Sequence, residues 1–305
     1  MKLLFITKDF SQHIERSSYY LAEELKKHTD LTLWHEHGYI NDILRQLSFE
    51  PDFILLNDFK PDYCPFIRRL GDSPIPYGII MHDLKYKMHL RKSFIEQENV
   101  RHIFSIYRDP FIKYFGEFQD RMIWFPHHVP DSIFKDYSLP KTTDILMSGA
   151  LWPHIYPFRN KMYQVLKSHP QFKYIPHPGY QDVNEQNSDI FVGERYAKLI
   201  NQSKIFLTCD SAEHFALLKY YEVLASGTLL LAPSNPELQE LGFEDGKTIV
   251  EINEENFMEK IQFYLQHDHE RELIVKQGLN MVKERHTTAK RVQEILGHIQ
   301  NIING

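Results

Sequence analysis

Glycine is absent from the start of the chain, and this absence excludes the commonest nucleotide-binding motifs. The first glycine of the 305-residue sequence is Gly38. A dinucleotide fingerprint, GxGxxG, needs glycines directly after a strand for a tight turn and for close approach to a pyrophosphate. Neither this pattern nor the phosphate-loop pattern GxxxxGK[ST] occurs in the sequence. The sequence therefore argues against an NAD or FAD enzyme and against a P-loop kinase or ATPase.

Cysteine, excess positive charge and long apolar runs are also scarce. Cys64 and Cys209 lie far apart without CxxC spacing, so neither a disulfide framework nor a zinc site is indicated. The net charge of −6 argues against a nucleic-acid partner. No apolar run approaches the roughly 18 residues that cross a bilayer, and the N-terminal MKLLFITKDF is typical of a strand, not of a signal peptide. We expect a cytoplasmic protein without a transmembrane segment.

Apolar runs of strand length alternate with helical patterns along the whole chain, which is typical of parallel βαβ units. Strands are expected at 2–7, 30–35, 52–58, 76–83, 101–107, 121–126, 144–149, 172–177, 203–209, 228–232 and 247–252. Helices are expected at 16–28, 41–47, 65–70, 86–96, 110–118, 157–168, 191–201, 216–225, 235–241, 254–267 and 269–284, with a last one near the C-terminus. The pattern predicts an α/β protein with two tandem Rossmann-like domains and a C-terminal helical tail.

A change of composition marks the expected domain boundary. The alternation stops at Pro126, and residues 127–143 are rich in proline and polar residues. We therefore expect an N-terminal domain at 1–130, a linker at 131–143, a second domain at 144–285 and a terminal helix at 286–305. Ile295 and Ile299 belong to an apolar face of that helix, with spacings of three and four residues.

The stretch from Cys209 to Pro233 is the best candidate for a ligand site. It is predicted to form a loop, a helix from about Ala216, a turn at Gly227 and a buried strand. Ligands of open α/β sheets bind at the carboxyl ends of strands, where helix N-termini offer free amides to phosphate. Within the helix, the ammonium of Lys219 suits a diphosphate and the carboxylate of Glu222 suits a ribose diol.

A second turn with phosphate-binding character follows the strand at 144–149. Gly149 allows backbone amides to approach an anion, and Arg159 and Lys161 supply positive charge beyond it. Taken alone, this is an ordinary βα turn followed by exposed basic residues. Because adjacent parallel strands end at one edge of the sheet, we expect the turn to lie beside Lys219 and the helix N-terminus near Phe215.

In the N-terminal half, His82 and Asp83 follow the strand at 76–83. Their position at a carboxyl strand end makes them candidates for the general base of a transfer to a hydroxyl group. Simple capping of the strand by His82 explains the position equally well. His127 and His128 lack an apparent third ligand, so solvated loop histidines explain them better than a metal site.

These motifs resemble those of the GT-B glycosyltransferases, in particular a bacterial group described as glycosyltransferase family 1 or spore-maturation-protein-like. In that group a basic residue, an aromatic residue and glutamate open a helix that ends in Ala-x-Gly. The resemblance covers about 145–295 well and the N-terminal half loosely. The matching positions are Lys219, Tyr221, Glu222, Ala225 and Gly227 in the helix, Pro126, Val129 and Phe134 in the connector, and His286, Thr287 and Arg291 in the tail.

The resemblance implies a glycosyltransferase that moves a sugar from a nucleotide-diphosphate donor, with UDP-sugar expected, to an unknown glycan, protein or small-molecule acceptor. No cofactor or metal is implied. The C-terminal domain would bind the donor and the N-terminal domain the acceptor. The positions expected to contact the donor are Gly149, Arg159, Lys161, Tyr180, Glu213, His214, Phe215, Ala216, Lys219 and Glu222.

Two departures from the family pattern leave alternatives open. Many retaining enzymes carry Glu-x7-Glu, but His214 stands where the first glutamate is expected, with Glu213 one residue early. Lysine at position 219 replaces the commoner arginine, so a two-pronged contact with phosphate is lost. The alternatives are a non-catalytic module that binds sugar nucleotides or glycans, and a nucleotide-sugar epimerase.

Overall fold

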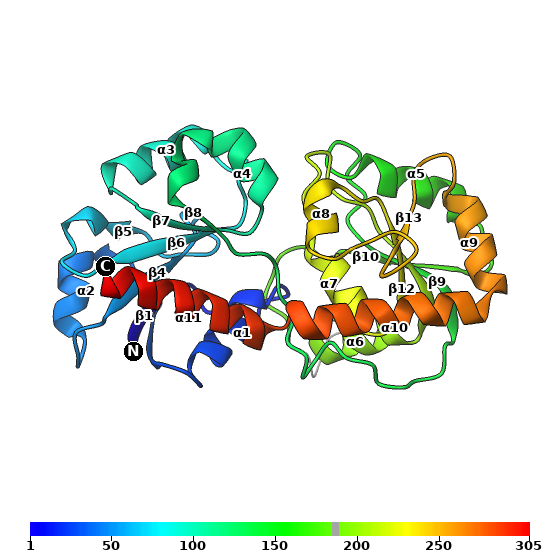
Figure 1. Ribbon diagram of the computed structural model, residues 1–305, viewed down its shortest axis with the longest axis horizontal. Coiled ribbons are helices and arrows are strands. Elements are labelled where there is room, and N and C mark those ends of the chain that lie inside the picture. The colour runs from blue at the N-terminus through cyan, green and yellow to red at the C-terminus, as the bar shows by residue number, and fades with distance from the viewer. Residues whose placement is uncertain (185–188) are drawn as a thin grey trace. The chain divides into compact units, whose positions relative to one another are not determined.

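The computed structural model describes residues 1–184 and 189–305, and these divide into two compact units. Unit 1 comprises Met1–Pro126 and Thr288–Gly305, and unit 2 comprises His127–Thr287. Each unit contains a parallel sheet with helices on both faces (Figure 1). The predicted class, two Rossmann-like α/β domains, is therefore confirmed. Residues 131–143, expected as a linker, lie within unit 2, and the C-terminal helix is part of unit 1.

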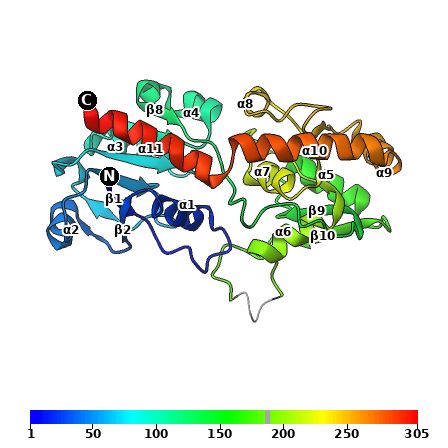
Figure 2. The same ribbon diagram turned by 60° about the horizontal axis from the view of Figure 1, so that its bottom comes forward.

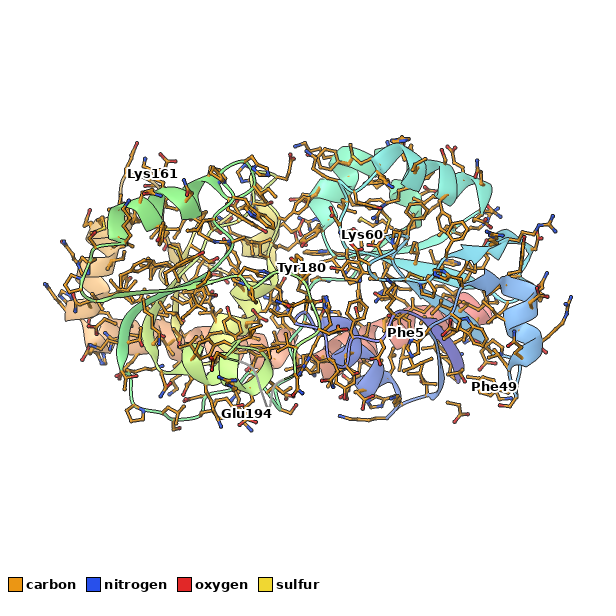
Figure 3. All side chains as sticks on the ribbon, turned by 180° about the vertical axis from the view of Figure 1, so that it is seen from behind. Phe5, Phe49, Lys60, Lys161, Tyr180 and Glu194 are labelled. Atoms are coloured by element: carbon orange, nitrogen blue, oxygen red, sulfur yellow. The ribbon has the colours of Figure 1, made fainter. Side chains whose placement is uncertain are left out.

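The main sheet of unit 1 has the strand order β2-β1-β4-β6-β7-β8, and every pairing is parallel. The central strands are apolar on both faces, as expected for strands covered by helices on both sides. Phe5 of β1, for example, lies fully buried inside the unit (Figure 3). The strands are β1 (Lys2–Ile6), β2 (Asp30–Trp34), β4 (Phe53–Asn57), β6 (Tyr77–Met81), β7 (His102–Ser105) and β8 (Met122–Trp124), with β3 (Gly38–Tyr39) and β5 (Ile67–Arg68) in a separate pair.

Helices cover both faces of this sheet. Figures 1 and 2 show α3 (Met88–Gln97) and α4 (Arg108–Phe115) on one face. On the other face, α11 (Thr288–Asn304) packs against α1 (Ser17–Leu25). The apolar face of α11, which includes the fully buried Ile295 and Ile299, explains why the end of the chain returns to unit 1. Helix α2 (Ile40–Gln46) and the short 3-10 helices η1 (Leu70–Asp72) and η2 (Gly116–Arg121) complete the unit.

Unit 2 is built around a five-stranded parallel sheet with the order β10-β9-β11-β12-β13. Its core joins this sheet to α5 and α9 on one face, while α7 packs against α6, α10 and β12 on the other. The strands are β9 (Thr143–Gly149), β10 (Phe172–Pro176), β11 (Ser203–Leu207), β12 (Leu229–Ala232) and β13 (Val250–Glu251). The helices are α5 (Pro157–Leu166), α6 (Gly193–Asn201), α7 (Leu218–Ala225), α8 (Pro236–Glu240), α9 (Phe257–Gln266) and α10 (Asp268–Arg285).

One expected element is wrong. Residues 65–70 were expected to be helical, but Ile67–Arg68 form β5, which pairs with β3. Its side chains alternate as in a strand, with Ile67 buried between the exposed Phe66 and Arg68. Six residues are too few to distinguish this period from a helical one.

No helix in the described part of the chain is both long and apolar enough to span a membrane.

Candidate functional site

Two positively charged side chains meet at the glycine that ends β9. Gly149 has a φ of +123°, and a Cβ atom at this position would lie 3.0 Å from Nη1 of Arg159 and 3.4 Å from Cε of Lys219. Arg159 comes from α5 and Lys219 from the first turn of α7. Glycine is needed here because a side chain would enter the space that the two cations occupy and would strain the backbone. The predicted convergence of Gly149, Arg159 and Lys219 is thus present within unit 2.

The positive charge of Arg159 is buried among neutral hydrogen-bond acceptors. Only 2% of the residue is exposed, and its hydrogen bonds go to Ala150 O (3.2 Å), Thr208 Oγ1 (3.2 Å) and Cys209 O (3.5 Å). Its guanidinium also lies over the ring of Tyr156, and its Nε atom is buried with no hydrogen-bond partner among the described residues. A buried cation normally requires an anionic partner, because removing the charge from water is costly. Within the described residues, none makes an ion pair with Arg159.

Lys219 and Glu222 lie one turn apart on α7, and their charges affect the pKa values of neighbouring groups. Burial lowers the pKa of Lys219, and the nearby charge of Arg159 adds to this effect, whereas Glu222 opposes it. Burial raises the pKa of Tyr196, and the carboxylate of Glu222 raises it further. The hydroxyl of Tyr196 lies 2.7 Å from that of Ser148 on β9. Glu222 is therefore close to the cationic cluster, as expected.

Residues that the sequence analysis did not select complete the cluster. His177 follows β10, and burial together with the positive charges of Lys219 and Arg159 lowers its pKa to about 4. The hydroxyl of Tyr174 donates a hydrogen bond of 2.6 Å to the carbonyl of Gly149 and so fixes the turn after β9. The strand-end rule that selected Gly149 would also have found His177. Tyr196 reaches the cluster from α6, and no sequence signal indicated it.

Two predicted donor-binding residues lie apart from these cations. Lys161 pairs with Glu254 and projects from α5 towards solvent (Figure 3). Two residues along a helix turn the side chain by about 200°, so Arg159 and Lys161 cannot share a face. Tyr180 is 68% exposed and contacts the ring of His177 at a centroid distance of 5.0 Å. Tyr180 therefore contacts the cluster through His177.

The loop before α7 differs from the expectation. The helix begins at Leu218, so the predicted start near Ala216 is two residues early. The amides of Glu213 and Phe215 donate to Ser211 Oγ, both at 3.3 Å. Because the predicted helix N-terminus at Phe215 is a loop, the first amides of the helix come later in the chain. In the same loop Ala216 is buried, and His214, at a φ of +60°, pairs with Asp210 (2.7 Å).

The tail motif supports α7 from the side. His286 is buried, and its Nε2 lies 2.7 Å from the carbonyl of Leu241. Its ring stands edge-on to Tyr221, with the centroids 5.1 Å apart, and stacks with Phe243 at 5.9 Å. This aromatic packing fixes one side of the helix that carries Lys219 and Glu222.

A second polar cluster lies at the carboxyl edge of the sheet in unit 1. His82, directly after β6, lies 2.8 Å through Nε2 from Oδ1 of Asn57, the last residue of β4. The ring stacks on Tyr63 with centroids 4.4 Å apart and planes 6° from parallel. Burial lowers the pKa of His82, although the carboxylates of Asp58, Glu15 and Asp83 oppose this effect. A neutral imidazole in this position can accept a proton.

The neighbours of His82 hold its backbone in place. Asp58 and Arg91 form a fully buried ion pair of 2.9 Å. Asp58 Oδ2 accepts the backbone N–H of His82 at 2.8 Å, and its other oxygen accepts the N–H of Lys60 at 3.0 Å. Asp83 is more exposed, and its carboxylate lies 3.6 Å from the ammonium of Lys60. Of the two predicted catalytic residues, His82 is thus the one built into the sheet edge.

Comparison with known proteins agrees with this architecture. Residues 159–297 match the family described as "Glycosyl transferase-like", a segment that includes Arg159, Lys219 and Glu222. No curated protein sequence matches the chain.

Solved structures match over nearly the full length. A glycosyltransferase from Rickettsia africae has a TM-score of 0.64 at 12% identity, with 99% of this chain and 98% of that one covered. Anabaena Alr3699/HepE in complex with UDP has a TM-score of 0.65 at 10% identity, covering 99% and 100%. A sucrose-phosphate synthase from Thermosynechococcus elongatus has a TM-score of 0.65 at 10% identity, covering 99% of each chain.

The chain has the GT-B fold, and the resemblance to GT-B glycosyltransferases seen in the sequence is confirmed. The narrower spore-maturation-protein-like group finds no support in these comparisons. In the described part of the chain, no three histidine, cysteine or acidic side chains gather as a metal site would require.

Proposed function

We propose that this protein is a glycosyltransferase that uses a nucleotide-diphosphate sugar, with UDP-sugar as the donor to test first. The observation that carries the proposal is the buried Arg159, which makes no ion pair with a carboxylate of the described residues, beside Lys219 at Gly149. Two adjacent cations repel each other, and a bound diphosphate would compensate both. HepE, which shares the fold, is described in complex with UDP and with UDP-glucose, and this supports the choice of nucleotide.

Each part of the cluster has a role in this proposal. Arg159 and Lys219 would bind the diphosphate and stabilise the charge that builds up as it leaves, which is the largest catalytic term in many transfer enzymes. Glu222 would accept hydrogen bonds from the ribose hydroxyls. Because side-chain cations provide this charge stabilisation, we assign no metal to the reaction.

Unit 1 would supply the acceptor-activating group. In the transfer, the acceptor oxygen forms a bond to the anomeric carbon, and the bond from that carbon to the diphosphate oxygen breaks with its electron pair leaving on UDP. The hydroxyl proton passes to a base, and we assign that role to His82. A correctly placed base contributes about 10²- to 10⁴-fold in rate.

A thermal-shift screen against UDP-, GDP-, TDP- and CDP-sugars tests the donor assignment. Ligand that binds only the native state raises the unfolding temperature. We expect UDP-sugars to raise it, and Glu222→Gln to reduce the UDP affinity measured by calorimetry while leaving the unfolding temperature of the free protein unchanged. An affinity that Glu222→Gln leaves unchanged would remove the ribose assignment, and no response to any nucleotide sugar would overturn the donor site.

Acceptor dependence separates the remaining functions. A transferase consumes donor faster when a suitable acceptor is added, an epimerase converts the donor without any acceptor, and a binding module leaves it intact. Incubation with the donor found by the screen, with and without a panel of glycans, distinguishes the three. Conversion that is the same in both arms would contradict transfer.

A further inference from the structure

The strongest unassigned feature is the hydrogen-bond arrangement around Asn57 in unit 1. Asn57 ends β4 and has no exposed surface. Its amide nitrogen donates to Thr7 Oγ1 at 2.8 Å and to Ser18 Oγ at 2.9 Å. Its amide oxygen lies 2.8 Å from Nε2 of His82. The three polar contacts of this buried side chain are thus all made with other residues of unit 1.

This arrangement decides which nitrogen of His82 carries the proton. The hydroxyl of Thr7 has two carbonyl acceptors for its own hydrogen, Lys8 O at 3.1 Å and Tyr63 O at 3.5 Å, so towards Asn57 it acts as the acceptor of the amide. Both amide hydrogens of Asn57 are then used, and its oxygen can only accept. The partner of that oxygen, Nε2 of His82, must therefore be an N–H donor.

The second nitrogen of the ring is left as the acceptor. A neutral imidazole has one protonated and one unprotonated nitrogen, so a proton on Nε2 leaves a lone pair on Nδ1. Nδ1 makes no hydrogen bond with any residue that the structure describes. The stacked Tyr63 and the bond from the His82 amide to Asp58 fix the plane and the backbone of the residue.

We infer that Asn57 is a positioning residue that holds His82 in the Nε2–H tautomer, so that Nδ1 is the only nitrogen able to take a proton from an acceptor hydroxyl. The link to an acceptor rests on the function proposed above. The tautomer itself depends only on contacts within unit 1. The charged groups that act on His82 are Asp58, Glu15, Arg91 and Asp83.

Nitrogen NMR of ¹⁵N-histidine-labelled full-length protein tests the tautomer without any substrate, with His82→Gln identifying the His82 signals. In the wild type we expect Nε2 to give the shift of a protonated nitrogen and Nδ1 that of an unprotonated one. Asn57→Ala should move both signals towards the average of the two tautomers. The control, Ser18→Ala, removes another contact of the amide and should leave them unchanged.

A second variant covers the case in which Asn57→Ala does not fold. Asn57→Asp keeps the size and the acceptor but adds a negative charge, so the tautomer should persist while the pKa of His82 rises. A wild-type His82 protonated on Nδ1, or a His82 pKa that does not rise in Asn57→Asp, would overturn the inference.

Kinetics distinguishes this inference from the proposed function. With a donor and acceptor in hand, Asn57→Ala should lower kcat by about tenfold or more, a part of the general-base effect, with the donor KM unchanged. An Asn57→Ala enzyme that loses the fixed tautomer but keeps its kcat would show that the tautomer has no catalytic role. If no transfer occurs under any condition but the NMR result holds, the proposed function fails and the tautomer assignment stands.

Discussion

Replacement of Lys219 by methionine gives the sharpest test of the proposed donor site. Methionine keeps most of the length and the apolar stem of the side chain but removes the ammonium group. Lys219 makes no ion pair with a carboxylate among the described residues, and burial lowers its pKa, so its charge is unfavourable in the free protein. The variant should therefore lose ligand affinity without losing stability.

The size of the binding loss follows from the contact that is removed. A hydrogen bond to a charged group contributes about 1.5–3 kcal/mol. Since about 1.4 kcal/mol corresponds to a factor of ten, UDP should bind Lys219→Met about 10- to 150-fold more weakly. The stability effect has the opposite sign. The folded state binds fewer protons than the unfolded state between the lowered pKa and the ordinary value near 10.5, so the charged lysine destabilises the fold at neutral pH.

Calorimetry with UDP and thermal unfolding of the free protein measure the two effects. Lys161→Met is a matched control, because Lys161 lies in the same unit and pairs with Glu254 outside the cationic cluster. We expect the control to bind UDP as the wild type does. Equal affinity in wild type and Lys219→Met, or a lower unfolding temperature in Lys219→Met alone, would refute the assignment of Lys219 to an anion.

Two further predictions concern the same cluster. Gly149→Ala should cost about 1–3 kcal/mol in urea unfolding because of its φ of +123° and because the new Cβ would lie 3.0 Å from Arg159. It should cost more than Gly179→Ala, where φ is +90° but no atom of the described residues, chain neighbours aside, lies within 4 Å of the new Cβ. Stability should fall as the pH drops from about 6.5 to 4, because unfolded His177 binds a proton near 6.5 and folded His177 only at about 4. His177→Gln should lose about 1 kcal/mol less over this interval after solvent screening is allowed for, as thermal unfolding at several pH values would show.

The fold was predictable because the apolar runs of strand length and the helical patterns in the sequence coincide with strands and helices of the structure almost everywhere. Strands such as KLLFI and FILLN are continuous apolar runs, which only sheets covered on both faces require. The exception, β5, is a two-residue strand whose pairing with β3 depends on contacts distant in sequence. Such pairings leave no local period to detect.

The candidate site was predictable where it depends on strand ends and not where it depends on side-chain direction. Gly149 and Lys219 were brought together by topology alone, since adjacent parallel strands end at one edge. Lys161 was grouped with Arg159 by proximity in sequence, which ignores the rotation of the helix between them. Tyr196 comes from α6, which packs against α7 on the face of the sheet opposite α5, and only the packing of the whole unit reveals it.

The return of α11 to unit 1 has a consequence for the order in which the molecule can form during synthesis. Unit 2 is one continuous segment, whereas unit 1 is completed by residues Thr288–Gly305. On the ribosome, where domains generally fold as units, unit 2 has all its parts before the helix that covers α1 has been made. Translation that stops shortly after Thr287 would thus yield a complete unit 2 joined to a unit 1 whose apolar surface remains exposed to water and to chaperones.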